Sequence, residues 1–209
     1  MLRTTLLSLG LALLGYLGAS WLTEGFQVWT AEGARRLTVI DRPMATPAVN
    51  IAGPDVTRQS LPDWLASEGR VTIVDFIYTR CPSVCSALGS GFQQLQQAIA
   101  ANPSEGVRLL SISFDPAHDD AARLRQYASQ LRADPRQWRF VTVPDHAELQ
   151  RLLDTFQVVV IPDGLGGYEH NAALLVVDQR GRLVRIFDYT ELDAALAYAL
   201  ALVPRRAAG

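Results

Sequence analysis

The chain contains no lysine, so arginine supplies all 19 of its basic residues, against 21 acidic ones. The formal net charge is −2, and this lack of a basic excess argues against nucleic acid as a partner. Charged residues make up only 19% of the chain and hydrophobic residues 49%, which excludes intrinsic disorder as the class of this protein. Its 209 residues suffice for one ordinary domain with additional segments, but not for two large domains.

Cysteine and histidine are also scarce, with two and three residues respectively. Two cysteines exclude a disulfide-rich scaffold, although they can form one pair. A structural zinc site is disfavoured as well, because it needs four ligands and no further cysteine is present. The position of this one pair therefore becomes the main clue to function.

A long uncharged segment lies near the N-terminus. The 20 residues from Thr4 to Thr23 carry no charge and include eight leucines. As a helix that rises about 1.5 Å per residue, they would span the roughly 30 Å apolar core of a bilayer. We predict one transmembrane anchor over residues 1–24, with the N-terminus inside. A cleaved signal peptide that ends at the small residues 18–20 is the alternative, and both place the remaining chain outside the cytoplasm.

Residues 25–60 form a less regular region. Three prolines interrupt it, and the apolar run from Leu37 to Ile40 indicates a short strand. We expect a linker and a small hairpin in this region. The folded domain is assigned to residues 61–204.

From about residue 70 onward, apolar runs alternate with helical stretches. Almost continuously apolar runs are typical of strands in a sheet that is covered on both faces. These runs are Val71 to Tyr78, Val107 to Phe114, Arg139 to Val143, Ala172 to Val177 and Leu183 to Phe187. Helices are expected at Cys85 to Ala101, Asp119 to Leu131, Asp145 to Phe156 and Leu192 to Val203. With Gly181 in a hairpin turn, this order predicts an α/β protein whose helices flank a central mixed sheet, as in the thioredoxin-like fold.

The two cysteines, Cys81 and Cys85, follow the first of these strands and open the first of these helices. Pro82 suits a helix opening, where its missing amide hydrogen costs nothing. Residues four apart share a helix face, so both sulfurs can point to one spot. The helix N-terminus and Arg80 favour the thiolate form. Such a pair can close a redox-active disulfide, bind a soft metal ion such as Cu(I), or form a purely structural bridge.

A further metal ligand would have to be one of the three histidines. His118 and His146 stand near the starts of expected helices and are typical of exposed residues at helix ends. His170 differs, because it ends a glycine-rich loop just before the strand from Ala172 to Val177. In the proposed sheet that strand lies beside the strand that leads to the cysteines. We therefore expect His170 to reach the cysteine loop and to act as a ligand.

Two aspartates have roles that the sequence leaves open. Asp75 lies within an apolar strand, six residues before Cys81. A desolvated carboxylate has a raised pKa and could accept a proton from the cysteine pair, whereas a structural hydrogen bond or ion pair is an equal alternative. Asp115 ends the next strand, where it can support the metal loop or cap a helix.

The sequence resembles the SCO/SenC family of membrane-anchored, thioredoxin-like copper proteins, which assist the assembly of cytochrome c oxidase. The motifs that carry the resemblance are DFIYTRCPSVC at 75–85, SFDP at 113–116 followed by Asp119, and EHN at 169–171. It covers about residues 37–203. The resemblance implies that Cys81, Cys85 and His170 bind one copper ion, as Cu(I) or, with a further donor, as Cu(II).

The resemblance also implies partners and a location. Copper would pass to subunit II of cytochrome c oxidase, or to another copper protein, on the periplasmic side of a bacterial inner membrane. Reduced Cys81 and Cys85 could instead reduce a disulfide between the cysteines of that copper centre to thiols, and would themselves become a disulfide. The chain departs from the family pattern at Ser86, where proline is usual, and at Glu169 and Asn171, which flank the histidine. A thiol–disulfide oxidoreductase without a metal and a scaffold with structural cysteines are the alternative functions.

Overall fold

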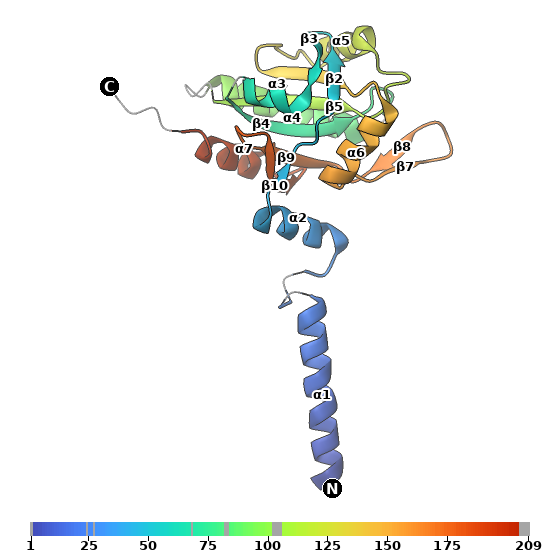
Figure 1. Cartoon of the computed structure of the whole chain (residues 1–209), viewed down its shortest axis with the longest axis vertical. Coiled ribbons are helices and arrows are strands. Elements are labelled where there is room, and N and C mark those ends of the chain that lie inside the picture. The colour runs from blue at the N-terminus through green and yellow to red at the C-terminus, as the bar shows by residue number, and fades with distance from the viewer. Residues whose placement is uncertain are drawn as a thin grey trace.

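A long helix, α1 (Leu2–Leu22), leads into the body of the protein in the computed structural model (Figure 1). The structure describes residues 2–23, 25–26, 28–67, 69–81, 84–101 and 106–204, and only the backbone of residues 2 and 84–87. Helix α1 is long and apolar enough to cross a membrane, and none of its apolar window is buried against the rest of the chain. A helix that is apolar on all sides and covers no core is suited to lipid.

The segment after α1 contains a helix where we expected a strand. Helix α2 (Ala31–Asp41) includes the run from Leu37 to Ile40, so the predicted strand is wrong. Thr30 caps α2 by accepting a hydrogen bond from the Gly33 amide at 3.0 Å, and the helix packs against strand β10. Four apolar residues cannot distinguish a strand from a buried helix turn, and here the cap and the tertiary contact favour the helix.

The small hairpin expected before residue 60 is confirmed. Strands β2 (Asn50–Gly53) and β3 (Val56–Ser60) pair in antiparallel orientation. A short helix that the sequence did not predict, α3 (Leu61–Ser67), follows β3 directly and buries Leu61, Trp64 and Leu65.

Within the described residues, eight strands form one mixed sheet in the order β1–β10–β9–β4–β5–β6–β2–β3. The strands not yet given are β1 (Met44–Ala45), β4 (Val71–Ile77), β5 (Val107–Ser113), β6 (Trp138–Thr142), β9 (Ala173–Val177) and β10 (Arg182–Asp188). Strands β4, β5 and β6 are parallel, whereas β9 pairs with β4 in antiparallel orientation. The predicted mixed sheet is confirmed, and so is the position of β9 beside β4. Gly181, with a φ of +70°, stands between β9 and β10 as expected.

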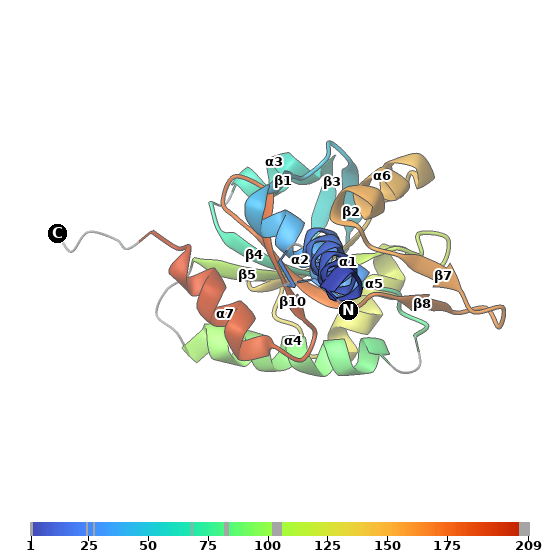
Figure 2. The same ribbon diagram turned by 90° about the horizontal axis from the view of Figure 1, so that it is seen from below.

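Helices cover both faces of this sheet (Figure 2). One face carries α4 (Val84–Ala101), α5 (Ala121–Gln130) and α7 (Leu192–Ala201), while α2, α3 and α6 (His146–Phe156) lie on the other. The four helices predicted for the domain are confirmed to within two residues at each end. The first residue of the predicted second helix, Asp119, lies outside α5, since the N-cap of α5 is Asp120.

The glycine-rich loop before His170 is the tip of a two-stranded arm. Strands β7 (Val160–Pro162) and β8 (Tyr168–His170) pair with each other and project from the body of the domain (Figures 1 and 2). The Asp163 carboxylate accepts hydrogen bonds from the Leu165 and Gly167 amides at the tip, at 2.7 and 2.9 Å. These bonds hold the pKa of Asp163 below its usual range. His170 is the last residue of β8 and pairs with Val160 of β7, so it lies in a strand.

Candidate metal site

Cys81 lies four residues after the end of strand β4, near the surface of the domain. After Ile77 the chain turns, and the Cys81 amide donates to the Tyr78 carbonyl at 3.2 Å. Cys81 is half-buried against the hydrophobic core. Helix α4 begins at Val84, so Cys85 lies in its first turn as predicted. Residues 82 and 83 and the Cys85 side chain lie outside the described residues, and the shared direction of the two sulfurs stays a prediction.

A buried hydrogen-bond network fixes the backbone just before Cys81. The Asp119 carboxylate accepts from the Thr79 amide at 2.9 Å, from the Thr79 hydroxyl at 2.6 Å and from the Ser113 hydroxyl at 2.6 Å. Asp119 is completely buried. Arg123 completes the network by donating to the Thr79 hydroxyl at 2.9 Å. Because one carboxylate ties the end of β4 to the end of β5, it positions the segment that leads to Cys81. The sequence placed Asp119 in a motif but did not predict this role.

A second network lies beside the first and involves Asp115. Its carboxylate accepts from Arg80 at 2.9 Å and lies 2.8 Å from Nδ1 of His118. The hydrogen bond to Asp115 raises the pKa of Arg80, so this residue keeps its positive charge next to Cys81. Helix capping, one of the two roles considered for Asp115, is performed by Asp120 instead. His118 is exposed, as predicted.

His170 lies in an aromatic environment at the base of the arm. Its ring packs edge-on against Phe114, with 5.2 Å between the ring centroids. The Tyr78 hydroxyl accepts from the Tyr168 amide and donates to the Tyr168 carbonyl, both at 3.1 Å. These two bonds join the residue three positions before Cys81 to the residue two positions before His170. This contact between Tyr78 and Tyr168 was not predicted, although Tyr78 belongs to the cysteine motif.

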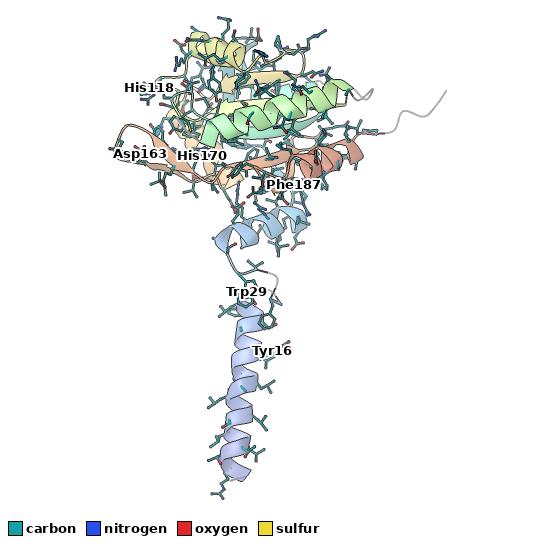
Figure 3. All side chains as sticks on the ribbon, turned by 180° about the vertical axis from the view of Figure 1, so that it is seen from behind. Tyr16, Trp29, His118, Asp163, His170 and Phe187 are labelled. Carbon is teal, nitrogen blue, oxygen red and sulfur yellow. The ribbon has the colours of Figure 1, made fainter. Side chains whose placement is uncertain are left out.

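The two ring nitrogens of His170 are buried without the hydrogen bonds that a histidine usually makes. Neither Nδ1 nor Nε2 has a partner among the described residues. Burial lowers the pKa of His170, so the ring is neutral at pH 7 and keeps an unprotonated nitrogen. A buried polar atom without a partner costs free energy unless something binds it. In Figure 3, His170 lies toward the end of the domain at which α4 begins.

Asn171, one of the departures from the family pattern, joins the two sides of the arm at its base. Its side chain accepts from the Val159 amide at 2.7 Å and donates to the Gln157 carbonyl at 3.1 Å. Asn171 thus joins the strand that leaves the arm to the segment that enters it. Glu169, on the other side of His170, is exposed.

Asp75 is buried in the middle of β4, on the face that α4 covers. It is in register with Ser111 of β5, and Ser111 accepts from the indole of Trp138, whose ring packs on Phe92 of α4. Burial raises the pKa of Asp75 to about 7, although a hydrogen bond with Ser111 opposes the shift. Its Oδ1 atom has no partner in the described part of the chain. Two structural roles were considered for Asp75, an ion pair and a hydrogen bond. Among the described residues it forms no ion pair, and a hydrogen bond satisfies its carboxyl group only in part.

The donor set fits a soft metal ion as far as its side chains are described. Among these side chains, no group of three or more histidine, cysteine, aspartate or glutamate residues is close enough to hold a metal. Because the Cys85 side chain lies outside that set, this observation leaves the predicted ligand set of Cys81, Cys85 and His170 untested. One thiol and one neutral imidazole without partners at its nitrogens are chemically suited to Cu(I). His146, the third histidine, begins α6 and is exposed, as predicted.

The sheet order, with a cysteine motif where β4 passes into α4, defines a thioredoxin-like α/β protein with a thiol-bearing site. The family model for SCO1/SenC matches residues 56–203, more than half of the chain. The chain therefore belongs to the SCO1/SenC family.

Individual relatives agree with this assignment. A SCO1 protein homologue from Bacillus subtilis (strain 168) is 26% identical over 144 residues, which cover 68% of this chain and 71% of that protein. Among solved structures, BsSco has a TM-score of 0.67 at 22% identity, covering 77% of this chain and 94% of that one. ScoI from Bradyrhizobium japonicum, solved with copper bound, has a TM-score of 0.63 at 23% identity, covering 76% and 99%. These matches confirm the thioredoxin-like fold that the sequence predicts.

Proposed function

We propose that this protein is a membrane-anchored copper-binding protein that assists assembly of the binuclear copper centre of cytochrome c oxidase. Copper is the cargo, and Cys81, Cys85 and His170 are its ligands. The observation that carries the proposal is that both ring nitrogens of His170 are buried and have no partner among the described residues. The pKa of His170 is lowered by burial, which favours the neutral ring. The copper-bound ScoI of the same family supports it.

The contacts around His170 support a site that is partly formed before copper arrives. Tyr78 ties the arm to the end of β4, and Phe114 packs on the imidazole ring. An ordered donor loses little conformational freedom on binding, which favours affinity. Copper bound there would be held by two thiolates and one imidazole, a set that suits three-coordinate Cu(I).

Helix α1 supports the proposed location. We place residues 1–24 in the bacterial inner membrane as a single-pass anchor, with residues 25–204 on the periplasmic side. The recipient would then be subunit II of cytochrome c oxidase or another copper protein. BsSco is described as a member of the Sco family of cytochrome c oxidase assembly proteins, which supports this recipient.

A thiol–disulfide oxidoreductase is the second candidate function, and Asp75 favours it. A carboxyl with a pKa of about 7 beneath the helix that begins with the cysteine motif can accept and return a proton at neutral pH. In this function Cys81 and Cys85 would cycle between dithiol and disulfide. BsSco is described as having a disulfide switch, which supports such cycling in this chain.

One titration separates these functions. We expect the full-length protein in detergent, with its cysteines reduced, to bind about one Cu(I) per chain in competition with a chromophoric chelator. Cys81→Ser, Cys85→Ser and His170→Ala should each weaken binding by at least about 100-fold, because each removes a proposed ligand. His146→Ala, at an exposed helix start, is the matched control and should bind as the native protein does.

The same variants test the second candidate. If His170→Ala retained native copper affinity, copper delivery through this site would be refuted. If that variant also reduced a test disulfide at the native rate, the oxidoreductase would become the better description. Native copper binding by all three ligand variants would leave a scaffold with structural cysteines.

A further inference from the structure

The chain leaves α1 through a turn in which the described backbone amides of Gly25, Phe26 and Val28 are hydrogen-bonded. The Gly25 amide donates to the Ser20 carbonyl at 2.7 Å, and the Val28 amide donates to the Thr23 carbonyl at 3.0 Å. The Thr23 hydroxyl donates to the Ala19 carbonyl at 2.7 Å and accepts from the Phe26 amide at 3.0 Å. Backbone groups satisfied in this way tolerate an environment with little water.

The turn brings aromatic rings back against the end of α1. Phe26 packs on Tyr16, with 5.3 Å between ring centroids, and Trp29 packs on Phe26 at 5.9 Å. The Trp29 indole donates to the Phe26 carbonyl at 3.1 Å. Figure 3 shows Tyr16 and Trp29 together on this end of the helix. We call Tyr16, Phe26 and Trp29 the aromatic turn.

The backbone adopts a costly conformation to make this contact. Gly25 and Phe26 both have positive φ, at 72° and 65°. Glycine tolerates this region, but for phenylalanine it costs on the order of 1 kcal/mol or more. Even so, the rings stay open to the surroundings, since Trp29 is 72% exposed and Tyr16 is 61% exposed. Most of the surface of these two rings is therefore covered neither by α1 nor by the domain.

The far side of the turn is joined firmly to the domain. Arg35 of α2 is buried and donates from Nε and Nη2 to the Phe156 carbonyl, at 3.2 and 2.9 Å. Arg36 forms an ion pair with Glu191 at 3.4 Å. These contacts fix α2 on the domain. The depth at which the turn lies in a membrane would therefore determine how far the domain stands from the bilayer. Part of the region predicted as a linker and hairpin over residues 25–60 is therefore a docked helix, α2.

We infer that the aromatic turn lies in the interfacial layer of the membrane, where lipid headgroups meet the acyl chains, and that it holds the domain at a fixed height above the bilayer. Its partner is the phospholipid surface. The inference rests on the membrane anchoring proposed for α1 and adds a second, interfacial contact. Tyrosine and tryptophan are suited to this layer because they have an apolar ring and a polar edge, and the turn continues directly from the apolar span.

Depth-dependent fluorescence quenching tests the inference in the full-length protein, reconstituted in phosphatidylcholine vesicles. The chain has four tryptophans, of which Trp64 and Trp138 are buried in the core and Trp21 and Trp29 are exposed. Trp21→Phe therefore leaves Trp29 as the reporter. We expect lipids brominated near the headgroup end of the acyl chain to reduce the Trp29 emission roughly twofold, and lipids brominated near the chain ends to reduce it less.

Matched variants make the outcome decisive. Trp29→Phe leaves Trp21 as the reporter of α1, and flotation of the vesicles reports anchoring itself. If the protein floats and Trp21 is quenched by lipid while Trp29 is quenched only by a water-soluble agent, the interfacial contact is refuted and the anchor stands. If the protein does not float, both fail. Phe26→Ala removes the ring between Tyr16 and Trp29 and should weaken lipid quenching of Trp29, whereas unchanged quenching would contradict the role of the stacked rings.

Discussion

Two groups of buried polar atoms lie in or near the segment that leads to Cys81, and they differ in whether their hydrogen bonds are satisfied. The Asp119 carboxylate accepts three hydrogen bonds from Thr79 and Ser113. By contrast, Oδ1 of Asp75 and both nitrogens of His170 have no partner among the described residues. Satisfied buried groups stabilise one conformation, whereas unsatisfied ones cost free energy and are retained where a ligand or a proton will use them. We therefore interpret the first group as a scaffold and propose that the second group carries the chemistry.

The largest expected effect concerns the charge on Asp75. The folded-state pKa is raised from 3.8 to about 7, so the unfolded chain loses this proton at lower pH than the folded protein does. The free energy of unfolding should therefore fall as pH rises from about 4 to about 7, by about 4 kcal/mol from this residue, and stay level above that range. Asp75→Asn removes this contribution. Urea unfolding of both proteins across this range measures the difference.

The comparison between variants isolates Asp75, because the other titrating groups are common to both proteins. Asp41→Asn, which changes an exposed aspartate at the end of α2, serves as the control and should follow the native pH dependence. If native protein and Asp75→Asn showed parallel curves, Asp75 would not be a proton carrier at neutral pH.

A smaller effect is expected from the satisfied group. Asp119→Ala leaves the Thr79 amide and the hydroxyls of Thr79 and Ser113 without their acceptor, which should lower the free energy of unfolding by about 3 kcal/mol or more. Since Thr79 is two residues from Cys81, Cu(I) affinity should also fall by about tenfold. Denaturant unfolding of the apoprotein and a chelator competition measure the two effects.

The neighbouring Asp120 provides a matched control. It caps α5 by accepting from the Arg123 amide at 2.8 Å and is exposed, so Asp120→Ala should cost about 1 kcal/mol and leave copper affinity unchanged. An Asp119→Ala variant that loses no more stability than Asp120→Ala would contradict the positioning role.

The core of the fold could be predicted from sequence because buried strands and amphipathic helices have distinct patterns. The strands β4, β5, β6, β9 and β10 were all located by continuous apolar runs. The run from Leu37 to Ile40 was misassigned because it is short, and its helical state depends on the Thr30 cap and on contact with β10. The sequence predicts a loop where the arm that carries His170 lies, because strands of three residues have too few positions to reveal a period.

The candidate site was predictable where it depends on strand order and not where it depends on side-chain geometry. The expectation that β9 lies beside β4 brought His170 toward Cys81 and is confirmed at the level of the sheet. The hydrogen bonds between Tyr78 and Tyr168, and those of Asp119, join residues far apart in the chain or hidden within a motif. No local pattern indicates such pairs, because their formation depends on the completed fold.

The smallest change in stability, and the sharpest contrast with Asp119, is expected from His170→Phe. Phenylalanine keeps the ring contact with Phe114 and removes two buried nitrogens that have no partner among the described residues. The variant apoprotein should therefore unfold at the same urea concentration as the native apoprotein, or be stabilised by about 1 kcal/mol.

Copper should separate the two proteins. A ligand present at about 100 times its Kd stabilises the native fold by about 2.7 kcal/mol, whereas the variant lacks an imidazole to bind it. Urea unfolding with and without Cu(I) measures both quantities. A loss of several kcal/mol in the apoprotein would instead mean that the His170 nitrogens are satisfied within the fold, and the distinction between scaffold and chemistry would fail at this residue.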